Sequence, residues 1–293
     1  MMVSGVGRTR RELFGWVVEQ LSQAGIEDPA REAWRLLTPS RGGVPPFLMD
    51  PLGVPTETEV KNVCELVARR RRREPLEYIR GSAEFWSREF FVDGRVLIPR
   101  PETELLVERV LYALPTLPRG SLVDVGTGSG VLAVTLAAET RDRPVFAVDI
   151  SPDALDVAEK NARWHDVEDR ITFLVGDLLE PLPAGLPVAA VISNPPYVSQ
   201  PDMAVLQPEV GAWEPSDALA AGSDGLALYR RLTPMARDVL LPGGLLAVEV
   251  GWSQAQAVAD MLQRCGFEDT VTHNDLSGIA RVVTGCKPKE GTR

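Results

Sequence analysis

The sequence predicts an α/β protein with a doubly wound, mostly parallel sheet, preceded by a small helical unit. From residue 121 onward, short apolar stretches of strand length alternate with stretches of helical periodicity. This alternation is typical of a parallel sheet with helices on both faces. Upstream, apolar residues recur at helical spacing from residue 10 to about residue 73. A length of 293 residues also favours one large domain and one smaller one.

The smaller unit is predicted to be helical. Apolar residues at helical spacing indicate helices around Leu13–Leu21, Ala33–Leu37 and Val60–Val67. The stretch from Thr38 to Pro55 contains five prolines, which cannot continue a helix, so we expect a loop there. The third helix ends in the arginine run Arg69–Arg73. This run is either a solvated helix end that complements the helix dipole, or a docking surface for an acidic or RNA-bound partner.

A change of period marks the connection between the two domains. From Phe85 to Ile98 the apolar residues recur with a period of two, as in a β-strand, and Asp93-Gly94 is typical of a β-hairpin turn. A helix is expected from about Glu102, because the preceding Pro101 is tolerated at a first turn. We therefore expect a helical domain over residues 1–83, a hairpin connector over 84–100 and the α/β domain over 101–293.

The strands of the α/β domain locate its candidate functional residues. They are expected at Leu122–Val125, Val145–Ile150, Ile171–Val175, Val188–Ser193 and Leu245–Val250, with two more strands near the C-terminus. Ligands of such sheets bind beyond the carboxyl ends of the strands. The residues that follow each strand are therefore the candidates.

Composition excludes several classes of protein. A net charge of -10 opposes an extended polyphosphate partner, so no direct nucleic-acid partner is expected. Cys64, Cys265 and Cys286 are widely spaced, which argues against disulfides and against a zinc site, and no metal is expected. The N-terminus mixes arginines and a glutamate with few apolar residues, and no stretch approaches about 18 uninterrupted apolar residues, so neither a signal peptide nor a membrane span is expected. We expect a cytoplasmic, monomeric protein without a membrane span.

A glycine-rich loop follows the first predicted strand. Glycine occupies three of the five positions from Gly126 to Gly130, which lets the backbone turn tightly and approach a ligand. The loop lacks the lysine of a phosphate-binding loop, and Asp124 upstream would repel a phosphate but attract a cation. S-adenosylmethionine, which carries an ammonium and a sulfonium, is such a ligand. A glycine turn without a ligand is the alternative.

Acidic residues follow the next two strands. Asp149 could accept both hydroxyls of a ribose, or it could merely cap the following helix. Asp177 could accept from an adenine amino group while Leu178 packs on the ring, or it could be a turn residue after Gly176.

The motif with the most chemical content is Asn-Pro-Pro-Tyr at residues 194–197, after the fourth predicted strand. Its two prolines fix two φ angles, and the first of them keeps Asn194 extended, so the turn is stiff. The Asn194 side-chain oxygen and the Pro195 carbonyl could each accept one N–H of an NH2 group, and Tyr197 could form a flat wall. A purely structural turn is the alternative.

Two fixed acceptors suit the methylation of an amide nitrogen. Resonance makes this nitrogen a poor nucleophile, and removing its proton first would be costly. Acceptors that bind the N–H groups more strongly as positive charge develops favour the transition state. No histidine base is required, and the chain's two histidines, His165 and His273, do not follow a strand near the motif.

These motifs resemble the release-factor glutamine methyltransferase family, also called the HemK or PrmC family. Beside the glycine loop and residues 194–197, the resemblance rests on residues 75–81, 96–104 and 218–226, and it spans nearly the whole chain. It implies a class I S-adenosylmethionine-dependent methyltransferase domain and an N-terminal helical domain that engages the protein substrate. The implied reaction is N5-methylation of the glutamine in the Gly-Gly-Gln loop of class 1 peptide-chain release factors.

The resemblance also implies roles for individual residues. Cofactor binding is expected of Gly126, Thr127, Gly128, Ser129, Gly130, Asp149, Asp177, Leu178 and Asn194; substrate binding of Asn194, Pro195, Pro196 and Tyr197; and catalysis of Asn194, Pro195 and Tyr197. The connector residues Arg100, Pro101, Glu102 and Thr103 are expected to line the site. Residues 275–281 depart from the family by lacking an acidic or polar residue just before Arg281, a departure expected to affect local packing away from these motifs.

Two other functions remain open at the level of sequence. Methyltransferases that act on the amino groups of DNA or RNA bases use similar Asn/Asp-Pro-Pro-aromatic turns, although the acidic charge opposes this function. The other alternative is a non-enzymatic binding module, in which the Asn-Pro-Pro-Tyr turn has no catalytic role.

Overall fold

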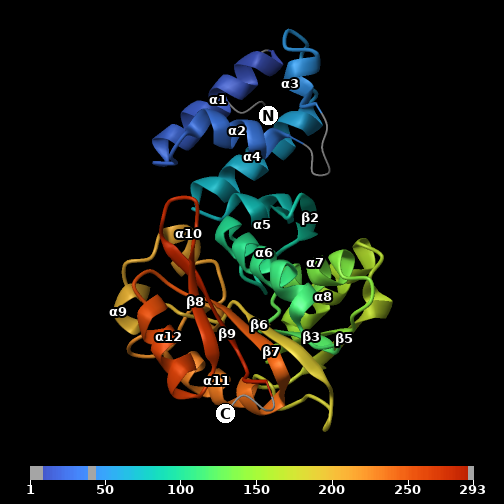
Figure 1. The fold of residues 1–293 in the computed structure, drawn as a ribbon. Helices are drawn as coiled ribbons and strands as arrows, with labels where there is room; N and C mark the ends of the chain where they lie inside the picture. Colours follow the sequence, from blue (N-terminus) through green and yellow to red (C-terminus); the bar gives the residue numbers. More distant parts are fainter. Residues whose placement is uncertain (1–8, 39–43, 290–293) are drawn as a thin grey trace. The chain divides into compact units, whose positions relative to one another are not determined.

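The computed structural model describes residues 9–38 and 44–289 (Figure 1). The chain forms two compact units. The first comprises the described residues up to Ser82 together with Gln207–Trp213, and the second comprises Ala83–Leu206 and the described residues from Glu214 onward. Within the described ranges, no helix combines the length and the apolar character needed to cross a membrane.

The first unit is a small helical bundle. Its helices are α1 (Arg10–Gln23), α2 (Pro29–Leu37), α3 (Pro46–Met49), α4 (Glu57–Arg71), α5 (Leu76–Arg80) and α10 (Pro208–Gly211). Helices α1 and α4 each begin with a capping box, in which a threonine and a glutamate three residues later satisfy each other's backbone N–H groups. The bundle closes around Val17, Leu21, Ile26, Ala33, Leu36, Val67, Leu76 and Ile79.

Helix α3 corrects the prediction of a loop from Thr38 to Pro55. The helix begins at Pro46, and a proline is tolerated there because the first turn leaves its N–H groups without helical partners. Residues 39–43 of the same stretch lie outside the described part of the chain.

The second unit contains the predicted doubly wound sheet. Its strands are β3 (Ser121–Val125), β4 (Val145–Asp149), β5 (Ile171–Val175), β6 (Val188–Ser193), β7 (Leu240–Glu249), β8 (Glu268–Asn274) and β9 (Ala280–Cys286). They are ordered β5-β4-β3-β6-β7-β9-β8, and only the pairs that include β9 are antiparallel. Strand β7 starts earlier than predicted, with a register irregularity where the sequence contains Pro242-Gly243-Gly244.

Helices cover both faces of this sheet (Figure 1). Residues of α6 (Glu104–Ala113), α7 (Val131–Glu139) and α8 (Pro152–Trp164) belong to one apolar cluster. Residues of α11 (Ala227–Val239) and α12 (Ala255–Arg264) belong to a second cluster. Burial of both faces explains why the parallel strands β3, β4 and β6 are mostly apolar rather than alternating, and the arrangement confirms the predicted fold class.

The hairpin lies earlier in the chain than predicted. Strands β1 (Ser82–Phe85) and β2 (Arg88–Phe91) pair, and Trp86 and Ser87 form the turn with φ of 52° and 55°. This turn has positive φ at two residues other than glycine, which the sequence pattern does not reveal. Asp93 instead accepts the backbone N–H of Arg95 at 3.1 Å, so Asp93-Gly94 is a local turn and not the hairpin turn.

The helix after the connector begins as predicted with a proline in its first turn. The 3-10 helix η1 (Pro101–Thr103) leads directly into α6. This arrangement fixes Thr103 at the junction, where its side chain is buried.

Candidate active site

Four neighbouring parallel strands end in register. Val148 of β4 lies opposite Val125 of β3, Val125 lies opposite Ser193 of β6, and Ser193 lies opposite Val248 of β7. The Ser193 hydroxyl donates to the Val125 carbonyl at 2.7 Å, which ties the two central strand ends together. The residues that follow this row are Asp149, Gly126, Asn194 and Glu249. The fold therefore aligns the candidate residues along one edge of the sheet.

The glycine loop presents an open backbone face. Gly126 and Gly128 have φ of +72° and +54°, and a Cβ added to either would meet nothing within 4 Å. At Gly130, by contrast, a Cβ would lie 2.9 Å from the Ala158 Cβ on α8. The first two glycines thus allow the turn and leave space beside it, whereas the third permits close helix packing.

Asp124 places an unpartnered carboxylate oxygen just before this loop. The residue is fully buried, and its Oδ2 accepts from the Thr127 hydroxyl at 2.6 Å and from the Ala133 N–H at 3.1 Å. Its Oδ1 has no hydrogen-bond partner among the described residues. Burial raises the pKa of Asp124 to about 7. A cationic ligand nearby would favour the charged form, so the group suits an ammonium or sulfonium.

Asp149 organises the same loop from the neighbouring strand. Its Oδ2 accepts the Gly128 N–H at 2.8 Å, and its Oδ1 accepts the Ser151 N–H at 2.9 Å. Helix α8 is capped by Ser151, which accepts from Ala154, so the interpretation of Asp149 as the helix cap is wrong. Burial raises the pKa of Asp149 above its ordinary value, although these two hydrogen bonds act to lower it. Each oxygen retains a second lone pair, which is what a ribose diol needs.

Asp177 and Leu178 follow β5, one strand further from the centre. The Asp177 carboxylate pairs with Arg231 of α11 at 2.5 Å, a partner that the sequence did not suggest. Leu178 has φ of +50°, an uncommon conformation for a leucine, and its buried side chain joins the cluster that contains α11 and α12. The Asp177 carboxylate, which was expected to accept from an adenine amino group, is therefore already partly engaged by Arg231.

The Asn-Pro-Pro-Tyr turn is held through both of its polar side chains. Asn194 Nδ2 donates to the Thr103 hydroxyl at 3.1 Å, which leaves the amide oxygen of Asn194 as the available acceptor. The Tyr197 hydroxyl lies 3.5 Å from Glu249 Oε1. Burial raises the pKa of Tyr197 to about 12, so its phenol stays neutral.

The backbone of Tyr197 is fixed by close neighbours. Gln254 Nε2 donates to its carbonyl at 2.9 Å. A Cβ on Gly225 would lie 2.4 Å from the same carbonyl, and a Cβ on Gly251 would lie 3.0 Å from Tyr197 Cδ2. These two glycines explain how the loop around residue 225 approaches the Tyr197 carbonyl and the loop around residue 251 approaches its ring so closely.

The connector supplies Thr103 and charged neighbours. Arg100 pairs with Glu214 at 2.6 Å, and the other Glu214 oxygen accepts the Ile98 N–H at 3.2 Å. The charge of Arg100 lowers the pKa of Tyr197 and that of Glu102 raises it, so both lie near the turn. Of the four connector residues expected at the site, Thr103 contacts Asn194 directly.

Sequence reasoning missed Glu249 and misplaced Arg281. The pKa of Glu249 is raised to about 7 chiefly by burial, and Arg281 opposes this shift. Arg281 also lies 3.8 Å from Glu102, so residues 275–281 do not lie away from the site motifs. Within this segment, Asp275 Oδ2 accepts from Arg281 Nε at 3.0 Å. A tight turn, in which Asp275 also accepts the N–H groups of Ser277 and Ile279, brings the two residues together.

Comparison with known proteins identifies the domains and the fold. The methyltransferase small domain model matches residues 101–208, and the PrmC N-terminal domain model matches residues 12–81. Among solved structures, the hMettl16 catalytic domain in complex with the MAT2A 3′UTR hairpin 6 superposes with a TM-score of 0.55 and 14% identity, covering 83% of this chain and 87% of that chain. This likeness concerns the fold alone. The protein is a methyltransferase.

Curated relatives identify the family. A release factor glutamine methyltransferase from Geobacter sulfurreducens is 41% identical over 284 residues, which cover 94% of this chain and 96% of that protein. A protein of the same name from Moorella thermoacetica is 41% identical, and the match covers 96% of this chain and 100% of that protein. The one from Escherichia coli is 37% identical, and the match covers 92% of this chain and 97% of that protein. The chain belongs to the release factor glutamine methyltransferase family, which confirms the resemblance seen in the sequence.

Proposed function

We propose that this chain transfers the methyl group of S-adenosylmethionine to the side-chain nitrogen (N5) of the glutamine in the Gly-Gly-Gln motif of a class 1 peptide-chain release factor. The observation that carries the proposal is the acceptor geometry of Asn194. Its amide nitrogen is occupied by Thr103 and its oxygen is available, at the same sheet edge as the open glycine loop.

The cofactor-binding part of the site fits S-adenosylmethionine in charge and in shape. Asp124 offers an unpartnered oxygen to a cation, and Asp149 retains lone pairs for a diol. Gly126 and Gly128 leave space beside the backbone. When bound there, the cofactor supplies an electrophilic methyl group on a sulfonium.

The substrate part of the site orients a weak nucleophile. The Asn194 side-chain oxygen and the Pro195 carbonyl each accept one N–H of the glutamine NH2, and Tyr197 packs against the planar amide. Both acceptors bind more strongly as positive charge develops on the nitrogen, which lowers the barrier selectively. Fixing the two reactants in one orientation contributes further, up to ~7–11 kcal/mol in ideal cases. The proton leaves after the methyl group has been transferred.

The proposed partner is a protein in the cytoplasm, and the proposed enzyme is a monomer. The net charge of -10 supports a protein substrate over direct binding to nucleic acid, because phosphate-rich partners require clustered basic side chains. The first unit, which matches the PrmC N-terminal domain model, is the proposed substrate-engaging domain.

Labelled S-adenosylmethionine tests this proposal. The protein is incubated with a recombinant release factor, with its Gly-Gly-Gln to Gly-Gly-Ala variant, and with an RNA and a DNA duplex. We expect label on the wild-type release factor alone. Equal label on both release factors would contradict the assigned glutamine, and label on a nucleic acid would favour methylation of a base amino group.

A further inference from the structure

Gln254 lies between the end of β7 and helix α12, and its side chain does not cap that helix. It is the N-cap residue of α12, a position whose side chain commonly accepts from the first backbone N–H groups of the helix. Gln254 makes no such hydrogen bond. Its half-buried side chain instead reaches the Asn-Pro-Pro-Tyr turn, where its Nε2 donates to the Tyr197 carbonyl at 2.9 Å.

The Gln254 amide connects three loops. Its Nε2 donates to the Tyr197 carbonyl and, at 3.4 Å, to the Gly225 carbonyl. Its Oε1 accepts the Gly251 N–H at 3.0 Å. Because an N–H group can be accepted only by the amide oxygen, the bond from Gly251 fixes which end of the amide faces the two carbonyls. The two N–H groups on the amide nitrogen match these two acceptors.

Two glycines leave the space that this amide occupies. A Cβ on Gly225, whose φ is +73°, would collide with both Gln254 Nε2 and the Tyr197 carbonyl oxygen. A Cβ on Gly251 would lie 2.9 Å from Gln254 Oε1. A side chain at either position would therefore push the amide away from the turn. The two loops are shaped around the Gln254 side chain as well as around Tyr197.

The peptide group that closes the turn is held from two sides. Its N–H, which belongs to Val198, donates to the Leu219 carbonyl at 2.9 Å. Its C=O, which belongs to Tyr197, accepts from Gln254. These two hydrogen bonds together fix the plane of the peptide group, since its N–H and C=O point in opposite directions. Fixing this plane restrains the adjoining Cα of Tyr197 and thereby the direction of its ring.

The far end of the Tyr197 side chain is held less firmly. Its hydroxyl lies 3.5 Å from Glu249 Oε1, which is at the outer limit of a hydrogen bond. The ring packs against Gly251, where a Cβ would lie 3.0 Å from Tyr197 Cδ2. Gln254 binds both the Tyr197 carbonyl and the Gly251 N–H, so it keeps the ring and the backbone that it packs against in register.

We propose that Gln254 is a positioning residue, whose amide locks the Tyr197 carbonyl and the Gly251 backbone together and so holds the Tyr197 ring in place for the substrate glutamine. The inference rests on the proposed function, because it requires that the turn binds a glutamine amide. Gln254 itself does not touch the reacting atoms.

The decisive variant is Gln254→Glu, which keeps the length and shape of the side chain. The new carboxylate still accepts the Gly251 N–H, but it has no hydrogen for the Tyr197 carbonyl and places a negative charge against it. We expect kcat for the release factor above neutral pH to fall about 10- to 100-fold, as when a hydrogen-bond acceptor loses its donor. The affinities for S-adenosylmethionine and for the release factor, measured by calorimetry, should stay at the wild-type values.

The pH dependence of this variant separates hydrogen bonding from shape. The carbonyl oxygens of Tyr197 and Gly225 disfavour the new carboxylate and raise its pKa above that of an ordinary glutamate. A protonated carboxyl group regains one hydrogen, which it can donate to Tyr197. The kcat of Gln254→Glu relative to that of the wild type should therefore rise as the pH is lowered below neutral. A ratio that is the same at every pH would overturn the inference.

Gln254→Met gives a second test should Gln254→Glu fail to fold. Methionine is also long and unbranched, but it has no N–H to donate and does not titrate. We expect kcat to fall and its ratio to the wild-type kcat to stay constant over the same pH range. A wild-type kcat in Gln254→Met would overturn the inference.

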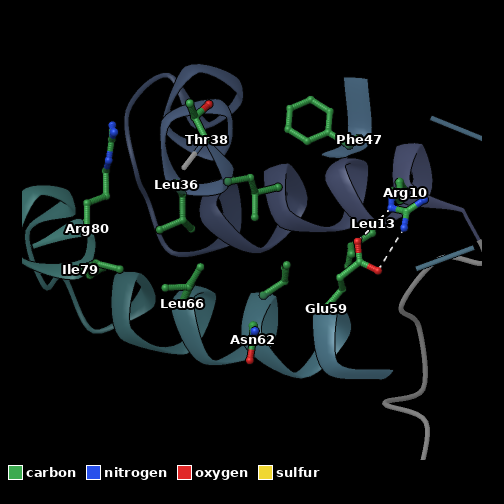
Figure 2. A pocket seen from close by; sticks show the side chains of 12 residues that line it. Arg10, Leu13, Leu36, Thr38, Phe47, Glu59, Asn62, Leu66, Ile79 and Arg80 are labelled. Atoms are coloured by element: carbon green, nitrogen blue, oxygen red, sulfur yellow. Dashed lines mark hydrogen bonds and ion pairs between the residues drawn. The ribbon is translucent and has the colours of Figure 1, made fainter. Parts of the chain in front are cut away.

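Two controls show whether the effects belong to this position. Gln256→Glu makes the same chemical change at an exposed residue of α12, which donates to Asp260 at 2.8 Å, and should alter neither kcat nor its pH dependence. Asn62→Asp converts an exposed amide of α4 in the first unit (Figure 2). Its unfolding in urea gives the reference against which Gln254→Glu is shown to be folded under the assay conditions.

The outcomes also separate the inference from the proposed function. If the wild-type protein labels the release factor, and both Gln254 variants do so at the wild-type rate, the inference fails and the proposed function stands. A parallel loss of affinity for S-adenosylmethionine would show a role in cofactor binding instead and would overturn the inference. Absence of label with the wild-type protein would overturn both.

Discussion

Buried charged side chains occur in both units, and among the described residues the buried carboxyl oxygens without a hydrogen-bond partner belong to Asp124 and Glu249 at the sheet edge. In the first unit, Arg70 is 7% exposed and pairs with Glu32 and Glu209, each at 2.9 Å. At the sheet edge, one oxygen of Asp124 and one of Glu249 have no hydrogen-bond partner among the described residues. Since an unpaired buried charge is costly, a fold tolerates it chiefly where a ligand or a reaction uses it.

The arginine run illustrates the paired case. Arg69 pairs with Glu74, Arg71 donates to Gln20, and Arg73 joins Arg70 on Glu209. Burial alone would raise the pKa of Glu209, but the hydrogen bonds from Arg70 and Arg73 hold it below its usual value. The prediction of a solvated helix end is therefore wrong for Arg70, whose partners are internal to its own unit.

The largest expected effect on activity concerns the acceptor at the sheet edge. Asn194→Ala removes one of the two acceptors for the substrate NH2, and we expect the rate of methyl transfer to fall about 10²- to 10³-fold, as when one such group is removed from other enzymes. Cofactor affinity, measured by calorimetry, should stay within a factor of a few. A wild-type single-turnover rate would rule out the two-acceptor mechanism.

The paired charges should matter for stability instead. Arg70→Ala leaves Glu32 and Glu209 without their shared partner, and the free energy of unfolding in urea should fall by about 3–5 kcal/mol. The matched control is Lys61→Ala, which breaks an exposed pair with Glu65 and should cost less than about 1 kcal/mol. Similar losses of unfolding free energy in the two variants would contradict the contrast between the buried ion pairs of Arg70 and the exposed ion pair of Lys61.

Cofactor binding depends on the acid of the neighbouring strand. Asp149→Ala should weaken S-adenosylmethionine by about 1.5–3 kcal/mol, the size of a hydrogen bond to a charged group, because it removes the proposed ribose acceptor and the support of the Gly128 N–H. The rate at saturating cofactor should change less than the affinity. Calorimetry and single-turnover kinetics measure the two effects separately, and the reverse pattern would argue against the assignment.

A further effect concerns the pH dependence of stability. The pKa of Asp124 is about 7 in the fold and near its ordinary value of about 4 in the unfolded chain, so between these values the fold binds the extra proton. The stability contribution is therefore complete below about pH 4 and is lost as pH rises through 7.

Asp124→Asn should remove this part of the pH dependence. Urea unfolding of the ligand-free protein across that range measures the slope, with Glu168→Gln as the control at an exposed acid. An unchanged slope in Asp124→Asn would show that the carboxyl group titrates alike in the folded and unfolded chain.

Local patterns and long-range register explain what the sequence could and could not reveal. The Asn-Pro-Pro-Tyr turn and the glycine loop were predictable because proline and glycine fix the backbone within a few residues. Glu249 and Arg281 were not, because strand pairing brings them near Asn194 from more than 50 residues away. Arg70 meets Glu209 across 139 positions of sequence, which no helical pattern indicates.

The position of the transferred methyl group tests the central claim most directly. After incubation with S-adenosylmethionine, the release factor is digested and the peptide that contains Gly-Gly-Gln is fragmented by mass spectrometry. The acceptor geometry at Asn194 predicts one added methyl group on the side-chain nitrogen of that glutamine. A methyl group on another residue, or an unmodified peptide from a release factor that binds the enzyme, would contradict it.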